Sequence, residues 1–199
     1  MVSVQHAYTT KAWSLKMSTI PGRSESALIV IDVQNGVVAN AFKRDEIVGN
    51  MRTLVKKARE TNVPVVWVQH SDGGLIRDSA QWQIVPELVP NDDEQIVHKN
   101  YRSSFEETNL EEILAGENIA HLIVCGAQTN YCVRHTIAAA LERGYDVTLV
   151  DDAHTTDDEL WGKVDVFAEQ IIEEQNHVCT EYRLPGRMCN TAATSSVFN

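Results

Sequence analysis

The sequence lacks several features that would direct a search for function. No apolar run approaches the roughly 20 residues that a membrane-spanning helix needs, and the N-terminus has no apolar core of a secretory signal peptide. Positive charge is scarce, because 17 Lys and Arg residues stand against 28 Asp and Glu residues, for a net charge of −11. Such a surface repels nucleic acids and anionic lipids, so we expect neither a nucleic acid nor a membrane as a partner.

Cysteine is also rare, with four residues at positions 125, 132, 179 and 189. No Cys-x-x-Cys pair occurs, and the spacings suggest neither a zinc site nor a disulfide framework. Cys125 and Cys179 lie in apolar runs typical of buried core thiols, whereas Cys189 lies in a polar C-terminal segment. We therefore expect free thiols, no bound metal and a cytoplasmic location, where thiols stay reduced.

Glycine-rich phosphate-binding loops are missing as well. Neither G-x-G-x-x-G nor G-x-x-x-x-G-K-[ST] follows a predicted strand, so no nucleotide cofactor is expected. The length of 199 residues and the apolar content of 43% suit one domain with a substantial core. We assign that domain to residues 26–183. Residues 1–25 are polar and aperiodic and are predicted to form an N-terminal arm, and residues 184–199 an irregular tail.

Within this domain, short apolar runs alternate with segments of helical periodicity. Amphipathic helices are predicted after the first, third, fourth and fifth runs. Because such alternation requires parallel pairing with right-handed crossovers, the predicted fold class is α/β. It is a three-layer α/β/α sandwich around a doubly wound, mainly parallel, six-stranded Rossmann-like sheet. The predicted strands are residues 27–31, 65–70, 95–99, 122–125, 146–150 and 177–180.

Three reactive side chains lie at the carboxyl ends of predicted strands. Asp32 follows the first strand, Lys99 ends the third, and Cys132 follows the fourth. Each alone has an ordinary explanation as a turn residue, a surface lysine or a core thiol. Because the carboxyl ends of strands in a doubly wound sheet converge on one crevice, the three together predict a base, a cation and a nucleophile in one site.

The local surroundings of Cys132 also bear on its reactivity. With Thr129 as the N-cap, Cys132 would lie in the first turn of the following helix. The helix dipole and the unpaired N–H groups would then favour the thiolate over the thiol. We therefore expect an activated cysteine.

The motifs at these strand ends resemble those of the isochorismatase-like cysteine hydrolases. Asp-x-Gln-Asn stands at residues 32–35, and Lys99 is followed by the Ser-x-Phe-like residues 103–105. Gly-Ala-Gln-Thr-Asn-x-Cys-Val stands at residues 126–133. The resemblance covers roughly residues 25–182, and the cysteine-bearing motif is its most specific part.

This resemblance implies a catalytic triad of Asp32, Lys99 and Cys132. It also implies a cis peptide bond between Ala127 and Gln128, and an oxyanion hole formed by the backbone N–H groups of Gln128 and Cys132. Members of the superfamily assemble as homodimers or homotetramers, so we expect a homo-oligomer. Among side chains near the crevice, we select three as substrate contacts: Gln34, Phe105 and Tyr131.

Departures from the family pattern narrow the range of activities that we expect. Nicotinamidases of this superfamily hold a metal through Asp-x-His after the second strand, and residues 67–74 lack that motif. True isochorismatases cleave a vinyl ether and can work without the cysteine. The retained Cys132 favours a small-molecule substrate with an amide or ureido C–N bond, cleaved through a thioester acyl-enzyme. Two alternatives stay open: a vinyl-ether hydrolase in which Cys132 is a bystander, and a non-catalytic small-molecule binder.

Overall fold

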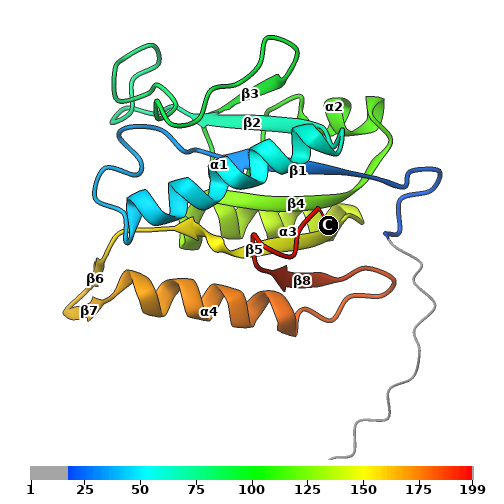
Figure 1. The fold of residues 1–199 in the computed structure, drawn as a ribbon. Helices are drawn as coiled ribbons and strands as arrows, with labels where there is room; N and C mark the ends of the chain where they lie inside the picture. The colour runs from blue at the N-terminus through cyan, green and yellow to red at the C-terminus, as the bar shows by residue number, and fades with distance from the viewer. Residues whose placement is uncertain (1–17, 199) are drawn as a thin grey trace, which may run out of the picture.

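The computed structural model describes residues 18–198, and it places a six-stranded sheet at the centre of the molecule (Figure 1). All neighbouring strands in this sheet are parallel, in the order β3-β2-β1-β4-β5-β8. The predicted α/β class and six-stranded sheet are thus confirmed. The strands are β1 Glu25–Ile31, β2 Val65–His70, β3 Gln95–Lys99, β4 Ile119–Ala127, β5 Asp146–Thr155 and β8 Cys189–Ala192.

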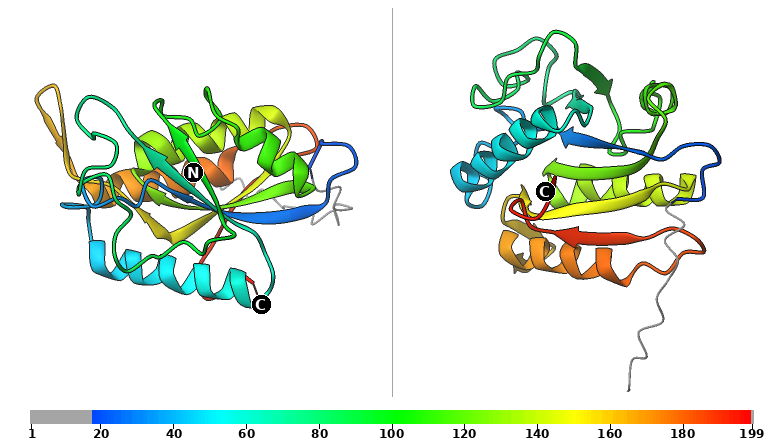
Figure 2. Two further views of the ribbon diagram at one scale, coloured as in Figure 1. Left: turned by 90° about the horizontal axis from the view of Figure 1, so that it is seen from above. Right: turned by 45° about the vertical axis from the view of Figure 1, so that its right-hand side comes forward.

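Helices cover both faces of the sheet (Figure 2). One face packs against α1, and the opposite face packs against α2, α3 and α4. A short π-helical turn, η1, leads into α3, and an antiparallel hairpin of β6 and β7 follows β5. The bounds are α1 Arg44–Glu60, α2 Leu110–Gly116, η1 Thr129–Val133, α3 Arg134–Arg143, α4 Ala168–Glu181, β6 Glu159–Trp161 and β7 Val164–Val166.

The buried strands explain why this sheet is so well specified by sequence. Alternate residues of β1 point to opposite faces, with Ala27 and Ile29 in the core beneath α3 and Leu28 and Val30 in the core beneath α1. Every residue from 27 to 31 is at most 1% exposed. A strand buried on both faces is a continuous apolar run, which is how β1 appears in the sequence.

The C-terminal third differs from its prediction. The helix expected to bury Val164 and Phe167 begins only at Ala168, and these two side chains are 62% and 57% exposed. Residues 159–166 instead form the β6–β7 hairpin, which turns at Gly162 with a φ of +67°. That left-handed backbone favours glycine and ends any helical path.

The last strand was also misassigned. Residues 177–180 belong to α4, and the sixth strand is β8, which pairs with β5 inside the segment predicted to be an irregular tail. A short apolar run does not distinguish a buried strand from one turn of a buried helix. Here Cys179 is fully buried on the inner face of α4, whereas Val178 beside it is half-buried.

The prediction that all four cysteines are free was wrong. Cys179 of α4 and Cys189 of β8 form a disulfide with a Cα–Cα distance of 5.2 Å, whereas Cys125 and Cys132 are free. The sequence spacing gave no sign of this bond, because α4 and β8 meet only through the packing of the helix on the sheet. The cytoplasmic location was inferred from free, reduced thiols, and these two cysteines are not free. The location therefore stays a prediction.

The structure describes only part of the predicted N-terminal arm. Of the predicted arm, residues 1–17 lie outside the described part, while Ser18 donates its backbone N–H to Asp146 and so attaches to β5.

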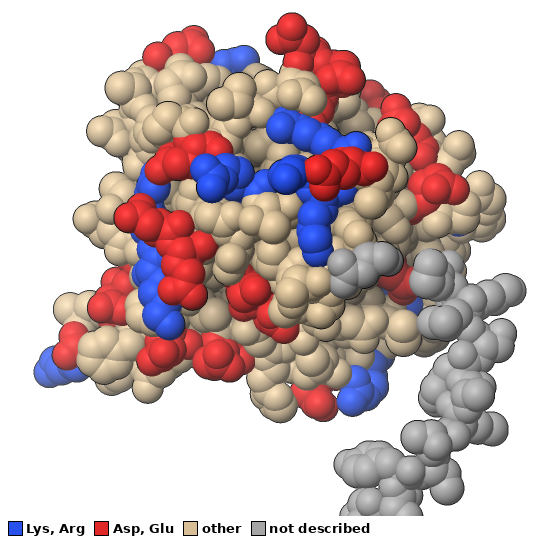
Figure 3. Space-filling view, viewed as in Figure 1, with Lys and Arg blue, Asp and Glu red and all other residues tan. Residues whose placement is uncertain are grey.

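Acidic and basic side chains are interspersed on the face that Figure 3 shows. In residues 18–198 no helix is long and apolar enough to cross a membrane, and no cluster of three potential metal ligands occurs.

Candidate active site

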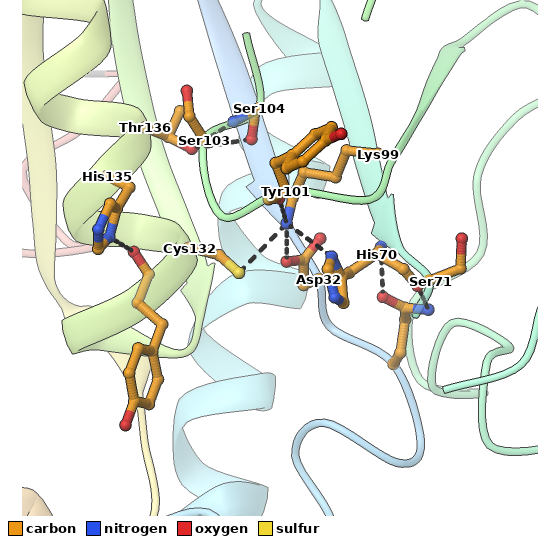
Figure 4. Close-up of polar contacts among 12 residues, drawn as sticks. Asp32, His70, Ser71, Lys99, Tyr101, Ser103, Ser104, Cys132, His135 and Thr136 are labelled. Carbon is orange, nitrogen blue, oxygen red and sulfur yellow. Dashed lines mark hydrogen bonds and ion pairs between the residues drawn. The ribbon is translucent and has the colours of Figure 1, made fainter. Parts of the chain in front are cut away.

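The three side chains predicted to meet do so at the carboxyl edge of the sheet (Figure 4). Lys99 Nζ lies 2.6 Å from Asp32 Oδ2 and donates a hydrogen bond to Cys132 Sγ at 3.2 Å. Asp32 directly follows β1, Lys99 ends β3, and Cys132 lies in η1 after β4. The ammonium group therefore stands between the carboxylate and the sulfur and contacts both.

The three side chains of the triad differ in their exposure to solvent. Asp32 and Lys99 are each 1% exposed, whereas Cys132 is half-buried. The ion pair is thus shielded from water, while the sulfur remains within reach of a substrate. A charge pair in such surroundings interacts more strongly than on the surface, and removal of either partner would leave the other charge buried and unpaired.

Burial also sets the protonation of the acidic groups. It raises the pKa of Asp32, an effect that Lys99 and the Cys132 thiol oppose. It likewise raises the pKa of Cys132 to about 12, with the negative charge of Asp32 adding to the effect and Lys99 opposing it. The raised pKa of Cys132 favours the thiol over the thiolate, opposite in direction to the effect expected from the helix dipole.

The local backbone explains part of this difference. Cys132 lies in the π-helical turn η1 and precedes α3, which begins at Arg134. Thr129 does not cap a helix, because its hydroxyl forms a 2.9 Å hydrogen bond with the ring of His154. The thiol is therefore outside the first turn of a regular α-helix, where the dipole would have acted on it.

Two backbone features shape the site. Asp32 has a φ of +50°, in the left-handed region that aspartate tolerates better than most residues. Next to it, a Cβ on Gly126 would lie 2.1 Å from the carbonyl oxygen of Ile31, so only glycine allows β4 to approach β1 here. The glycine that opens the cysteine motif is therefore required by the contact that brings the two strand ends together.

The peptide bond between Ala127 and Gln128 is cis, as the resemblance implied. It stands between the end of β4 and η1, close in sequence to Cys132. The assignment of the Gln128 and Cys132 N–H groups to an oxyanion hole stays a prediction.

The segment after β5 holds this turn through side chains that the sequence did not single out. Asp157 accepts a hydrogen bond from the side chain of Gln128 at 3.1 Å. Glu159 accepts one from Asn130 at 2.7 Å and another from the hydroxyl of Tyr131 at 3.0 Å. Three residues of the turn are thus tied to the start of the hairpin. Asp157 and Glu159 belong to the acidic run at residues 157–159.

A second missed residue is His70, at the end of β2. Its Nδ1 lies 3.4 Å from Lys99 Nζ (Figure 4), and its Nε2 lies 3.1 Å from Asp72 Oδ2. A lone histidine at a strand end carries little information in sequence, and only the pairing of β2 with β3, with His70 opposite Lys99, brings it to the triad.

The three predicted substrate contacts have different surroundings. Gln34 is fully buried, and its amide exchanges hydrogen bonds with the backbone N–H and C=O of His70. Phe105 is 8% exposed and packs against Tyr145 in the core. Tyr131 is half-buried, with the guanidinium of Arg102 4.1 Å from its ring centroid. Of the three, Tyr131 has the surroundings that best suit contact with a substrate.

The loop after β3 is anchored to α3. The backbone N–H of Ser104 donates a hydrogen bond to the Thr136 hydroxyl at 3.0 Å, and the hydroxyl groups of the two residues lie 2.9 Å apart. Lys99 also donates to the carbonyl oxygen of Tyr101 at 3.1 Å. These bonds hold Lys99 and the helix that follows Cys132 in a fixed relation.

A cavity of about 410 Å³ lies beside this cluster, against His70 and Gln128. A volume of this size suits a small molecule. Another cavity, of about 380 Å³, lies around Arg59 and Glu94. Among the described residues that line the two cavities none belongs to the triad, but His70 of the first contacts Lys99, so the first is the candidate substrate pocket. Its other lining residues are Gly36, Val37, Asp72, Gly74, Leu75 and Gln81.

Comparison with known proteins agrees with this geometry. The model of the isochorismatase domain family matches residues 26–166. A secreted isochorismatase effector from Verticillium dahliae is 30% identical over 136 residues, which span 65% of this chain and 72% of that protein. A ureidoacrylate amidohydrolase from an Enterobacter species is 27% identical over 187 residues, spanning 69% of this chain and 81% of its own length.

A solved structure has the same fold. The crystal structure of an isochorismatase from Pseudomonas putida superposes with a TM-score of 0.80 at 27% identity, covering 87% of this chain and 92% of the other. Since the family model spans most of the domain that carries Asp32, Lys99 and Cys132, and the relatives are hydrolases, this chain belongs to the isochorismatase family of hydrolases.

Proposed function

We propose that this hydrolase cleaves an amide or ureido C–N bond of a small molecule through a thioester on Cys132. The observation that carries the proposal is the position of the Lys99 ammonium, 2.6 Å from the Asp32 carboxylate and 3.2 Å from the Cys132 sulfur. A nucleophile, a base and a cation in contact are the components of covalent acyl transfer. The similarity to a ureidoacrylate amidohydrolase supports the same substrate class.

The first step is transfer of the thiol proton to Asp32 as Sγ attacks the substrate carbonyl carbon. Burial makes this carboxylate a better base than an exposed one, because it raises the pKa of Asp32. The transfer moves negative charge from the carboxylate to the sulfur while the ammonium of Lys99 remains next to both. The site thus avoids an isolated buried charge at either stage.

The remaining steps return each group to its starting state. Protonated Asp32 gives its proton to the leaving nitrogen as the C–N bond breaks, which leaves a thioester, or a thiocarbamate from a ureido substrate. Asp32 then takes a proton from water as its oxygen attacks the same carbon. The C–S bond breaks, the sulfur recovers its proton, and the carboxylic or carbamic acid departs.

The test is a screen of small amides and ureido acids for release of ammonia or amine, with acid quenching and intact-mass measurement to detect the acyl adduct. We expect turnover of at least one compound, an adduct in the parent protein, and neither in Cys132→Ala. Cys125→Ala is the matched control, since that free thiol is fully buried in the hydrophobic core and the variant should keep activity. Undiminished turnover by Cys132→Ala would refute the mechanism and favour cysteine-independent vinyl-ether cleavage.

A further inference from the structure

His70 has contacts that the mechanism above does not use. It ends β2, lines the candidate substrate pocket, and is half-buried. Its ring joins two groups, with Nδ1 3.4 Å from Lys99 Nζ and Nε2 3.1 Å from Asp72 Oδ2. Asp72 is fixed in turn, because its other oxygen accepts the backbone N–H groups of Gly74 and Leu75 at 2.7 and 2.8 Å.

These partners determine the tautomer of a neutral ring. A lysine ammonium only donates hydrogen bonds and a carboxylate only accepts them. His70 therefore accepts from Lys99 at Nδ1 and donates from Nε2–H to Asp72. This arrangement is the usual one for a histidine oriented by a carboxylate on its far nitrogen.

The ammonium of Lys99 is surrounded by four acceptors. They are Asp32 Oδ2 at 2.6 Å, the Tyr101 carbonyl oxygen at 3.1 Å, Cys132 Sγ at 3.2 Å and His70 Nδ1 at 3.4 Å. Since the ammonium has three protons, the longest bond is shared. A proton on Nδ1 would turn this acceptor into a second cation facing Lys99.

We propose that His70 is a positioning residue of the catalytic triad, oriented by Asp72, and that only its neutral form supports attack by Cys132. The proposal rests on the proposed function for its catalytic meaning. The charged groups facing His70 are Asp32 after β1, Lys99 at the end of β3, and Asp72 on the loop after β2. Histidine is the side chain that gains its charge between pH 8 and 5.

The expected consequence is a loss of reactivity in acid beyond the loss due to the thiol itself. A charge on His70 acts on Asp32 and makes that carboxylate a weaker base, whereas the groups that influence the thiol of Cys132 are Asp32 and Lys99. A protonated His70 would also displace the ammonium from its place between the two. Both effects slow proton removal from Cys132.

The test uses the rate of Cys132 carboxymethylation by iodoacetamide between pH 5 and 9, measured by intact mass. This readout needs no substrate, so it remains valid if the proposed amidohydrolase activity is wrong. His70→Asn provides a neutral acceptor that cannot be protonated. We expect the ratio of the His70→Asn rate to the parent rate to rise as the pH falls from 8.5 to 5.5, because only the parent has a ring at this position that can gain a proton.

Two further variants complete the test. His70→Phe removes the acceptor and should react more slowly than the parent at pH 8.5. His177→Asn, at an exposed position on α4, is the matched control and should match the parent throughout. Circular dichroism establishes that each variant is folded. If the His70→Asn and parent rates keep a constant ratio from pH 5 to 9, or if His70→Phe reacts at the parent rate, the proposal is overturned.

Discussion

Two edges of this molecule use cysteine in opposite ways. At the carboxyl ends of β1, β3 and β4, Cys132 is a free thiol held by Lys99. At the side edge of the sheet, Cys189 of β8 is bonded covalently to Cys179 of α4. β1 and β4, which lead into Asp32 and Cys132, have strands on both sides, whereas β8 has only β5 beside it and β3 has only β2.

This difference follows from how firmly each strand is held. The central strands are buried between helices on both faces, and their packing fixes a cluster of polar groups that would not assemble in solution. The four-residue β8 has one strand neighbour and offers little apolar surface, and short edge strands contribute few contacts of their own. A covalent link there replaces packing that a short edge strand cannot supply.

The two edges are connected through one buried side chain. His154 on β5 is fully buried, and its ring lies 2.9 Å from the hydroxyl of Thr129 in η1 and 2.9 Å from the side-chain oxygen of Asn176 in α4. The turn that carries Cys132 is thus tied to the helix that carries Cys179. Variants at each edge and at this link separate their roles.

The largest effect is expected from loss of the base. Asp32→Asn cannot accept the thiol proton, and we expect turnover and iodoacetamide alkylation of Cys132 to fall by about 10²–10⁴-fold, the usual contribution of general base catalysis. Asp165→Asn, at an exposed position on β7, is the control and should behave like the parent. An Asp32→Asn protein that is folded and alkylated at the parent rate would mean that another group removes the proton.

His154, which links the two edges, should make the free energy of unfolding depend on pH. Burial lowers the pKa of His154 to about 4, although its bond to Asn176 opposes this shift. Because the unfolded chain binds the proton near pH 6.5, stability is present above that pH and is lost as pH falls toward 4. The loss is about 3 kcal/mol.

Urea unfolding of the parent and of His154→Gln at pH 7 and pH 4 measures this contribution. The variant has no imidazole at this position to take up a proton. Between pH 7 and pH 4 its free energy of unfolding should therefore fall by about 3 kcal/mol less than that of the parent. His177→Gln, exposed on α4, should follow the parent. Equal changes in the parent and in His154→Gln would show that His154 does not stay neutral in the folded protein.

The smallest of the three effects is expected at the β8 edge. Replacing both Cys179 and Cys189 with Ser opens a short loop, because the two are 10 residues apart. The double variant should lose about 2–3 kcal/mol of unfolding free energy while it keeps its activity. Cys132→Ser should give the reverse result, with activity lost and stability kept. The comparison fails if dithiothreitol leaves the urea midpoint of the parent unchanged.

Prediction from sequence succeeded where a local pattern had one interpretation. The first five strands are apolar runs bounded by turns, and α1 shows an apolar face of Ile47, Met51 and Leu54 that is buried as predicted. Strands alternating with helices permit few topologies. The meeting of Asp32, Lys99 and Cys132 followed from topology, because parallel strands end at one edge of a sheet.

Prediction failed where the result depended on neighbours that are remote in the chain. The pKa of Cys132 is set by burial and by Asp32, which is 100 positions away in sequence, more than by the local helix. No local pattern marks Asp157 and Glu159 as site residues, and only the fold brings their carboxylates to Gln128 and Asn130. Residues 177–180 include a short apolar run that predicted a strand, yet they belong to α4.

By itself, the sequence determined the α/β class, the first five strands and the three reactive side chains, since apolar periodicity and strand order are local properties of the chain. Only the tertiary structure decided which thiols are bonded, which acids hold the turn after β4, and which groups raise the pKa of Cys132. Those properties arise from burial and from contacts between distant segments. Electrostatic and covalent interactions act through space, and no spacing along the chain encodes them.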